Sequence, residues 1–317
     1  MNTRQHHSRL FPAGAGRLLT ELGLALLITA AAAWTAAQPA AAQEPTATPG
    51  QTIPPEGTPF FLPFVAANPA AATPVPTPSA RTFDSVPVAG GSLGWPAQAS
   101  PDVNLLWRGY APTTAYLGLV NYNGDTDDDA PQMAGIFTPP RLPGFLSAQQ
   151  VYDWNWNCAP PPGCRGGLLT WPYAVTLLEL ATTPGEPLSI ASRSARIYAP
   201  DYKVMVLYAE ETRLTITYTR EDTPANGYML HFEDVAVDPA LVAFYRQLDA
   251  EGRQRLPALR NGEPWGTAAG PSIKVAVRDR GAFMDPRACK DWWAGYRSQC
   301  FVQLQRPAGW HPQGRQP

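Results

Sequence analysis

One histidine that lies away from both ends of the chain is the clearest candidate for acid–base chemistry. His231 lies in the alternating stretch Gly227–Asp234, and Glu233, two residues later, shares its face of an extended strand. A histidine beside a carboxylate titrates near neutral pH and can act as a general base. The hydrolase interpretation assigns no serine or cysteine nucleophile. A hydrolase that uses His231 and Glu233 is therefore the secondary interpretation, and a buried strand histidine is the simpler one.

Three aromatic rings alternate along the segment Val151–Asn157. Tyr152, Trp154 and Trp156 occupy every second position and share one face of an extended strand, while Asp and Asn occupy the other face. Aromatic rings offer flat apolar faces on which sugar rings can stack, and neighbouring amides can bind hydroxyl groups. The segment favours a glycan-binding surface, and the alternative is that the rings pack in the core.

The loop Gly124–Asp129 carries four aspartates, and Asp125, Asp127 and Asp129 are candidate calcium ligands. Calcium takes six to eight oxygen ligands from clusters of this type. The later glutamate of the twelve-residue helix-loop-helix pattern is missing, so a solvated acidic turn is the simpler interpretation. A glycosidase would need two carboxylates at a fixed separation. The sequence does not place any such pair of aspartates together in space.

The first 42 residues predict a secretory signal peptide. Arg4, Arg9 and Arg17 precede an apolar run from Leu22 to Ala33, and small residues before Gln43 suit cleavage. An uncleaved signal segment is the only contact with a membrane that we expect. The net charge of −2 argues against nucleic-acid binding, which needs a strongly basic face. We therefore expect a secreted or cell-envelope protein.

Residues 43–101 predict a disordered, extended spacer, because they are rich in proline and threonine and have no periodic apolar face. The apolar strip Phe60–Val65 interrupts this spacer, and it either docks on the folded domain or contacts a partner. Four cysteines follow the spacer, and an even number in an oxidising compartment predicts disulfides. Pairing of sequence neighbours, Cys158 with Cys164 and Cys289 with Cys300, is the most economical of three connectivities.

Residues 102–305 predict a single mainly β domain, an antiparallel sandwich or barrel-like fold, followed by a flexible tail at 306–317. The expected strands are rich in Val, Ile, Tyr and Thr and are bounded by turn residues. They fall within Ala115–Tyr122, Leu168–Leu180, Ala195–Ala209, Arg213–Thr219, Tyr228–Val235 and Ile273–Arg278. One inserted helix begins at Asp238 and Pro239, and we expect it to end at Gly252.

Two stretches of this domain carry a recognisable pattern of glycines and prolines. The first is Val175–Tyr198, with Thr-Pro-Gly at its centre, and the second is Leu256–Arg278, followed by Asp285 and Pro286. They resemble the opening and closing motifs of the lysostaphin-like zinc endopeptidases, the M23 peptidoglycan hydrolases. The resemblance implies a compact antiparallel β-sandwich with a groove. Residues 202–218 would be the family's strand pair, and residues 221–255 would be an insertion.

The positions that would hold the family's zinc ion carry other residues here. Val175 occupies the position of the first histidine, Glu179 that of the aspartate, and Ser272 and Lys274 those of the closing His-x-His pair. A catalytic zinc needs three protein ligands and an open site for water. Only Glu179 suits a metal ion, so we expect neither a metal nor any other cofactor.

The sequence thus predicts a degenerate lysostaphin-like domain, exported on a Thr/Pro-rich spacer, that binds a ligand without catalysis. Peptidoglycan or another envelope or extracellular glycan is the expected partner. The candidate contact residues are Tyr152, Trp154, Trp156 and Glu179. The alternatives are the hydrolase that uses His231 with acidic partners and a surface module that binds proteins.

Overall fold

The computed structural model describes residues 81–159, 162–306 and 308. The predicted signal peptide, most of the predicted spacer and the Phe60–Val65 strip lie outside the described residues. The folded domain begins earlier than the sequence predicts, because strand β1 (Asp84–Pro87) pairs with β12 (Arg255–Leu259) and Val86 is fully buried. A proline at the end of an edge strand is compatible with pairing. The sequence does not predict this strand, because it lies in a proline-rich segment.

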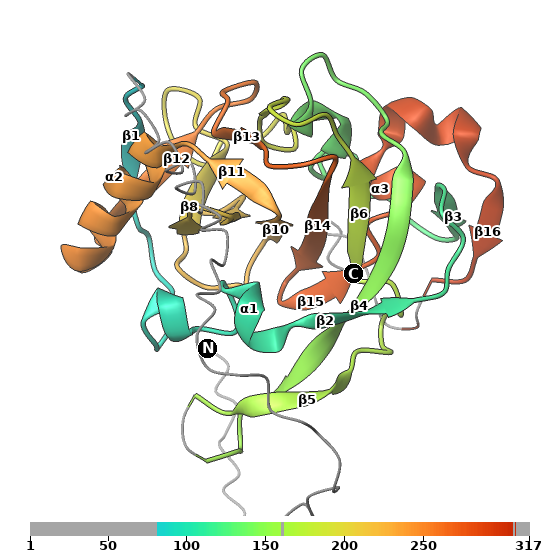
Figure 1. The fold of residues 1–317 in the computed structure, drawn as a ribbon, viewed down its shortest axis with the longest axis horizontal. Helices are drawn as coiled ribbons and strands as arrows, with labels where there is room; N and C mark the ends of the chain where they lie inside the picture. Colours follow the sequence, from blue (N-terminus) through green and yellow to red (C-terminus); the bar gives the residue numbers. More distant parts are fainter. Residues whose placement is uncertain (1–80, 160–161, 307, 309–317) are drawn as a thin grey trace, which may run out of the picture. The chain divides into compact units, whose positions relative to one another are not determined.

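One long antiparallel sheet forms the frame of the domain. Its strand order is β1–β12–β8–β9–β10–β14–β6–β4–β2, with β15 paired to β14 and β5 paired to β4 (Figure 1). The further bounds are β2 Tyr110–Thr113, β4 Phe145–Asn155, β5 Cys164–Leu168, β6 Leu177–Ala181, β8 Val204–Glu210, β9 Arg213–Thr217, β10 Tyr228–Glu233, β14 Ser272–Asp279 and β15 Ala282–Met284. Because β1 and β2 end this path, the sheet is not closed into a barrel.

Apolar side chains cover both faces of the sheet, which gives sandwich-like packing. Along β14, Val275 and Val277 belong to the larger core cluster, and Ala276 between them belongs to the smaller one. The larger cluster includes the fully buried Trp265, Trp292, Trp293 and Phe232, and the smaller one consists of Leu105, Val151, Leu177, Ala276 and Phe283. The predicted mainly β, antiparallel architecture is confirmed.

Two smaller sheets complete the strands of the described residues. One has the order β11 (Val235–Val237), β13 (Gly266–Ala268) and β7 (Pro187–Leu188), and in the other β3 (Val120–Tyr122) pairs in parallel with β16 (Val302–Leu304). Residues 221–255, which the resemblance would make an insertion, include β10, and β10 lies between β9 and β14 in the main sheet. Arg306, which the sequence predicts to be the first residue of the tail, contacts the domain, since its Nη2 lies 3.2 Å from Asp291 Oδ2.

The predicted helix is α2 (Pro239–Ala250), and its start is confirmed by the cap. Ala240 N donates to Asp238 Oδ1 at 2.9 Å, and α2 packs on β8 and β12 with its apolar residues buried. The sequence misses the shorter helices, which do not extend far enough to show periodicity. They are α1 Leu105–Arg108, α3 Cys289–Trp292 and the 3₁₀ segments η1 Ala97–Ala99, η2 Met133–Ile136 and η3 Ala294–Gln299. None of the helices in the described ranges is long and apolar enough to cross a membrane.

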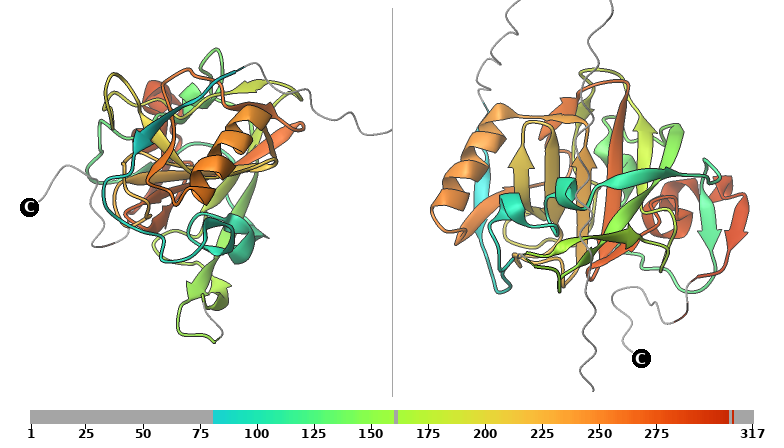
Figure 2. Two further views of the ribbon diagram at one scale, coloured as in Figure 1. Left: turned by 90° about the vertical axis from the view of Figure 1, so that its left-hand side faces the viewer. Right: turned by 60° about the horizontal axis from the view of Figure 1, so that its bottom comes forward.

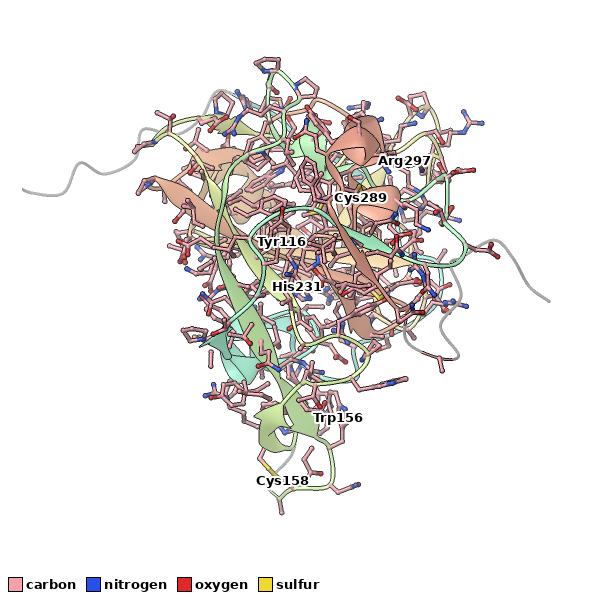
Figure 3. All side chains as sticks on the ribbon, turned by 90° about the vertical axis from the view of Figure 1, so that its right-hand side faces the viewer. Tyr116, Trp156, Cys158, His231, Cys289 and Arg297 are labelled. Carbon is pink, nitrogen blue, oxygen red and sulfur yellow. A yellow bond between two sulfur atoms is a disulfide. The ribbon has the colours of Figure 1, made fainter. Side chains whose placement is uncertain are left out.

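The second half of β4 and β5 form a hairpin that projects from the body of the domain (Figure 1 and Figure 2). We call this hairpin the arm, and it comprises residues 152–159 and 162–168. The disulfide Cys158–Cys164 closes its tip, and Figure 3 shows Cys158 and Trp156 at this far end. The second disulfide joins Cys289 to Cys300, so both predicted disulfides are present.

Candidate functional site

A row of charged and hydroxyl side chains crosses the main sheet from β8 to β4. Residues that lie directly opposite each other in neighbouring strands point to the same face, so the row follows from the strand register. Its members, in strand order, are Glu210, Arg213, Glu233, Lys274, Glu179 and Ser147. We call these six residues the polar row. Its charges alternate in sign from Glu210 to Glu179.

Ion pairs and hydrogen bonds join neighbours within the polar row. Arg213 Nη1 lies 2.8 Å from Glu210 Oε1, and Arg213 Nε lies 3.2 Å from Glu233 Oε2. Glu179 accepts two hydroxyl hydrogen bonds, from Ser147 at 2.5 Å and from Ser272 at 2.6 Å. The carboxylates of the row therefore already have protein partners.

Lys274 is paired outside the row. Its ammonium group forms an ion pair with Asp234 and lies 5.7 Å from the centre of the Tyr110 ring. Asp234 adopts a positive φ of 61° at the turn between β10 and β11. This left-handed conformation is tolerated better by aspartate than by most residues, and it is often found near functional sites.

The two carboxylates of the row that face Lys274 have opposite electrostatic environments. Burial raises the pKa of Glu233 to about 7, although the Arg213 guanidinium opposes the shift. The hydroxyl hydrogen bonds from Ser147 and Ser272 hold the pKa of Glu179 below its usual value. Glu233 thus retains its proton to a higher pH than an exposed glutamate does, whereas Glu179 loses its proton at a lower pH.

Of the four positions that the resemblance would assign to zinc ligands, Glu179 and Lys274 belong to this row, and Ser272 lies beside it. Glu179 accepts a hydrogen bond from Ser272 and pairs in register with Lys274, while Val175 is buried. These residues do not fit a zinc ion, because Val175 has no donor atom, Lys274 is cationic and both Glu179 oxygens already accept hydrogen bonds. Within the described residues, no group of three or more His, Cys, Asp and Glu side chains is placed to hold a metal.

His231, on β10, is fully buried. Its Nδ1 lies 3.0 Å from Thr215 Oγ1, and its ring stacks on Phe283 with the ring centres 5.9 Å apart. Because the Thr215 hydroxyl donates to Val103 O at 2.6 Å, we assign the imidazole proton to Nδ1. Nε2 then faces no hydrogen-bond partner among the described residues.

This environment does not suit His231 to the predicted general-base role. Burial, together with the positive charges of Arg278 and Arg108, holds the pKa of His231 well below its usual value, so the ring is neutral. Glu233 shares its face as predicted, but Glu233 bonds Arg213 and His231 bonds Thr215. A substrate would have no access to the imidazole.

The structure separates the four predicted contact residues. Glu179 bonds Ser147, which lies on the opposite face of β4 from Trp154 because side chains alternate along a strand. Trp154 is only 7% exposed, and its indole Nε1 donates to Pro162 O at 2.9 Å. Trp156 follows the end of β4, is 47% exposed and meets the Trp154 ring edge-on at 6.4 Å. A ligand can therefore reach the Trp156 ring, and the buried Trp154 ring packs edge-on against it.

Arg165 connects the predicted aromatic residues to a helix that the sequence did not reveal. It lies opposite Trp154 in the arm, and its guanidinium carbon lies 5.2 Å from the centre of the Tyr152 ring. Its Nη2 donates to Trp107 O at 3.2 Å and to Leu106 O at 3.4 Å, at the end of α1. We call Trp107, Tyr152, Trp156 and Arg165 the arm surface. No local sequence signal links α1 to the arm, because the link is a contact between distant residues.

The acidic loop is held by protein partners. Asp127 accepts hydrogen bonds from Tyr228 Oη at 2.8 Å and from Asp129 N at 2.9 Å. Asp129 forms an ion pair with Arg193 at 3.0 Å and a hydrogen bond with the Ser194 hydroxyl. These contacts favour the structural interpretation of the loop over the calcium alternative.

The surface pockets lie apart from the predicted contacts. A pocket of about 470 Å³ is lined mostly by β11, β13 and the start of α2, and it includes no residue of the polar row or the arm surface. Comparisons of the chain with protein-family models, with curated proteins and with solved structures find no match.

Proposed function

We propose that the chain is an exported, non-catalytic module that binds an envelope glycan, such as peptidoglycan, through the arm surface. The observation that carries the proposal is the half-exposed Trp156 ring at the tip of the disulfide-closed arm, supported by the buried Trp154. A ring held in this way loses little side-chain freedom when a sugar stacks on it. Trp107 is 43% exposed, and its backbone carbonyl accepts a hydrogen bond from Arg165 of this surface.

Export is supported by the two disulfides, which persist in oxidising compartments. A non-catalytic role is supported by the polar row, where each acidic residue already has a protein partner. It is also supported by His231, whose imidazole is buried. A hydrolase that uses His231 with acidic partners would need an accessible imidazole, and this makes the alternative weaker than the binding function.

We further propose that the domain is a degenerate relative of the lysostaphin-like peptidases. The support is the clustering of Glu179, Ser272 and Lys274, which the resemblance places at zinc-ligand positions, in neighbouring strands. On this view the ancestral metal site became the ion-paired polar row, and binding moved to the arm.

Co-sedimentation of the full chain with insoluble peptidoglycan tests the binding proposal. We expect saturable binding that a chelator does not change, and about tenfold weaker binding for Trp156→Ala. Phe301→Ala is the matched control, because Phe301 is 78% exposed and lines a pocket that contains no arm residue. Equal binding by the two variants, or no binding by the unaltered chain, would contradict the proposal. The module that binds proteins would then be the better interpretation.

A further inference from the structure

We propose that the arm surface selects acidic glycans, polysaccharides whose sugar rings carry a carboxylate, and that Arg165 binds the anionic group. This inference rests on the proposed function, because it names the class of glycan for the same surface.

Arg165 is held in place although it is exposed. Two backbone carbonyls at the end of α1 accept from its Nη2, and the Tyr152 ring lies beside the guanidinium. Gly109 makes this approach possible, because a Cβ at that position would lie 2.8 Å from Arg165 Nη2. Gly109 also has a φ of +67°, which other residues rarely adopt. The cation is therefore oriented before any ligand arrives.

The charge of Arg165 is not neutralised by the protein. Across the described ranges, no carboxylate oxygen lies within 4.0 Å of its guanidinium nitrogens, and Nε and Nη1 donate no hydrogen bond to these residues. Asp153, the nearest acidic residue along the opposite strand, lies on the other face of β4 and contacts Arg108 at 3.8 Å. In a chain with a net charge of −2, this leaves a local positive site on the arm.

The free N–H donors lie on the same surface as the rings. Arg165 pairs in register with Trp154, whose ring contacts that of Trp156, and Arg165 itself contacts Tyr152. A sugar ring stacked on Trp156 would bring a ring carboxylate toward the guanidinium, which lies over the Tyr152 ring. A charge-assisted hydrogen bond of Arg to carboxylate is about twice as strong as a neutral one. A neutral glycan could use the rings alone.

Polygalacturonate and its fully methyl-esterified form are a matched pair of probes, because esterification removes the charge and keeps the sugar backbone. We expect the full chain to bind the acid form at least tenfold more tightly at low salt, and we expect added NaCl to reduce this preference. Arg165→Gln should lower the affinity for the acid form to the affinity for the ester. Arg165→Lys should retain part of the preference, because the charge stays while the planar group is lost.

Arg255→Gln is the control with the same change of charge. Arg255 is exposed and bonds only Ser85 among the described residues, so its loss should leave the preference intact. Equal binding of the two polymers by the unaltered chain would overturn the inference and leave the glycan-binding proposal standing. An equal loss of preference in both glutamine variants would also overturn it, because general charge attraction would then explain the preference. Failure to bind either polymer or peptidoglycan would refute the proposed function itself.

Discussion

The replacement Glu233→Gln tests the electrostatics of the polar row, because Glu233 is the buried carboxylate of that row. Glu233 is only 5% exposed, and burial raises its pKa to about 7 from the usual 4.5, even with Arg213 Nε 3.2 Å away. The folded chain therefore holds this proton more tightly than the unfolded chain does. The stability that Glu233 contributes is complete below pH 4.5 and is lost as the pH rises through 7.

The size of the effect follows from the two pKa values. At about 1.4 kcal/mol for each pKa unit, a folded pKa of about 7 against 4.5 in the unfolded chain corresponds to about 3 kcal/mol. Glutamine keeps the shape of the protonated side chain and does not titrate. The unfolding free energy of Glu233→Gln, relative to the unaltered chain, should therefore rise by about 3 kcal/mol between pH 4.5 and pH 8.

Urea unfolding followed by tryptophan fluorescence, with disulfides intact, measures this difference at each pH. Glu179→Gln is the control in the same row. The pKa of Glu179 is lowered by hydrogen bonds from Ser147 and Ser272, so its stabilisation is lost only as the pH falls below 4.5. A difference for Glu233→Gln that is flat from pH 4.5 to 8, or that changes in the opposite direction, would refute the view that Glu233 is buried beside Arg213.

Three further outcomes follow from the arm and the acidic loop. Trp154→Ala should lower the unfolding free energy by about 3–5 kcal/mol in urea unfolding, because the ring is buried, whereas Trp156→Ala should change it by less than about 0.5 kcal/mol. Replacing Cys158 and Cys164 by serine should cost about 2 kcal/mol in the same assay, the value for a short closed loop. Calcium and chelator should leave Tm unchanged, because Asp129 is already bonded to the protein, and a calcium-dependent rise would contradict this.

The elements that the sequence predicted well have strong local signals. The strand β10 is a buried run of mostly apolar and aromatic residues, and helix α2 begins with an aspartate cap and a first-turn proline. Some predicted strand segments are longer than the strands in the structure. Their extra apolar residues lie in loops that pack against the domain. Only Val120–Tyr122 of Ala115–Tyr122 is a strand, and of Ala195–Ala209 only the end belongs to β8. Apolar side chains bury equally well in a strand and in a packed loop, so composition does not separate the two.

The candidate site was less predictable, because it depends on contacts between distant residues. The register of three strands brings Ser147, Glu179 and Lys274 of the polar row together. The residue pattern within one strand does not show how that strand aligns with its neighbours. The alternation of aromatic residues predicts a common face for Trp154 and Trp156. It does not predict that Trp154 is buried, with its indole bonded to Pro162 O, while Trp156 stays exposed.

The most direct test of the glycan-binding account is to observe the tryptophan indole N–H signals of the full chain by NMR while soluble peptidoglycan fragments are added. The account predicts that the signal of Trp156, assigned through Trp156→Ala, shifts in a saturable manner. The signals of the fully buried Trp265 and Trp292 should stay in place. A titration that leaves the Trp156 signal unchanged would contradict the account, as would shifts confined to tryptophans outside the arm surface.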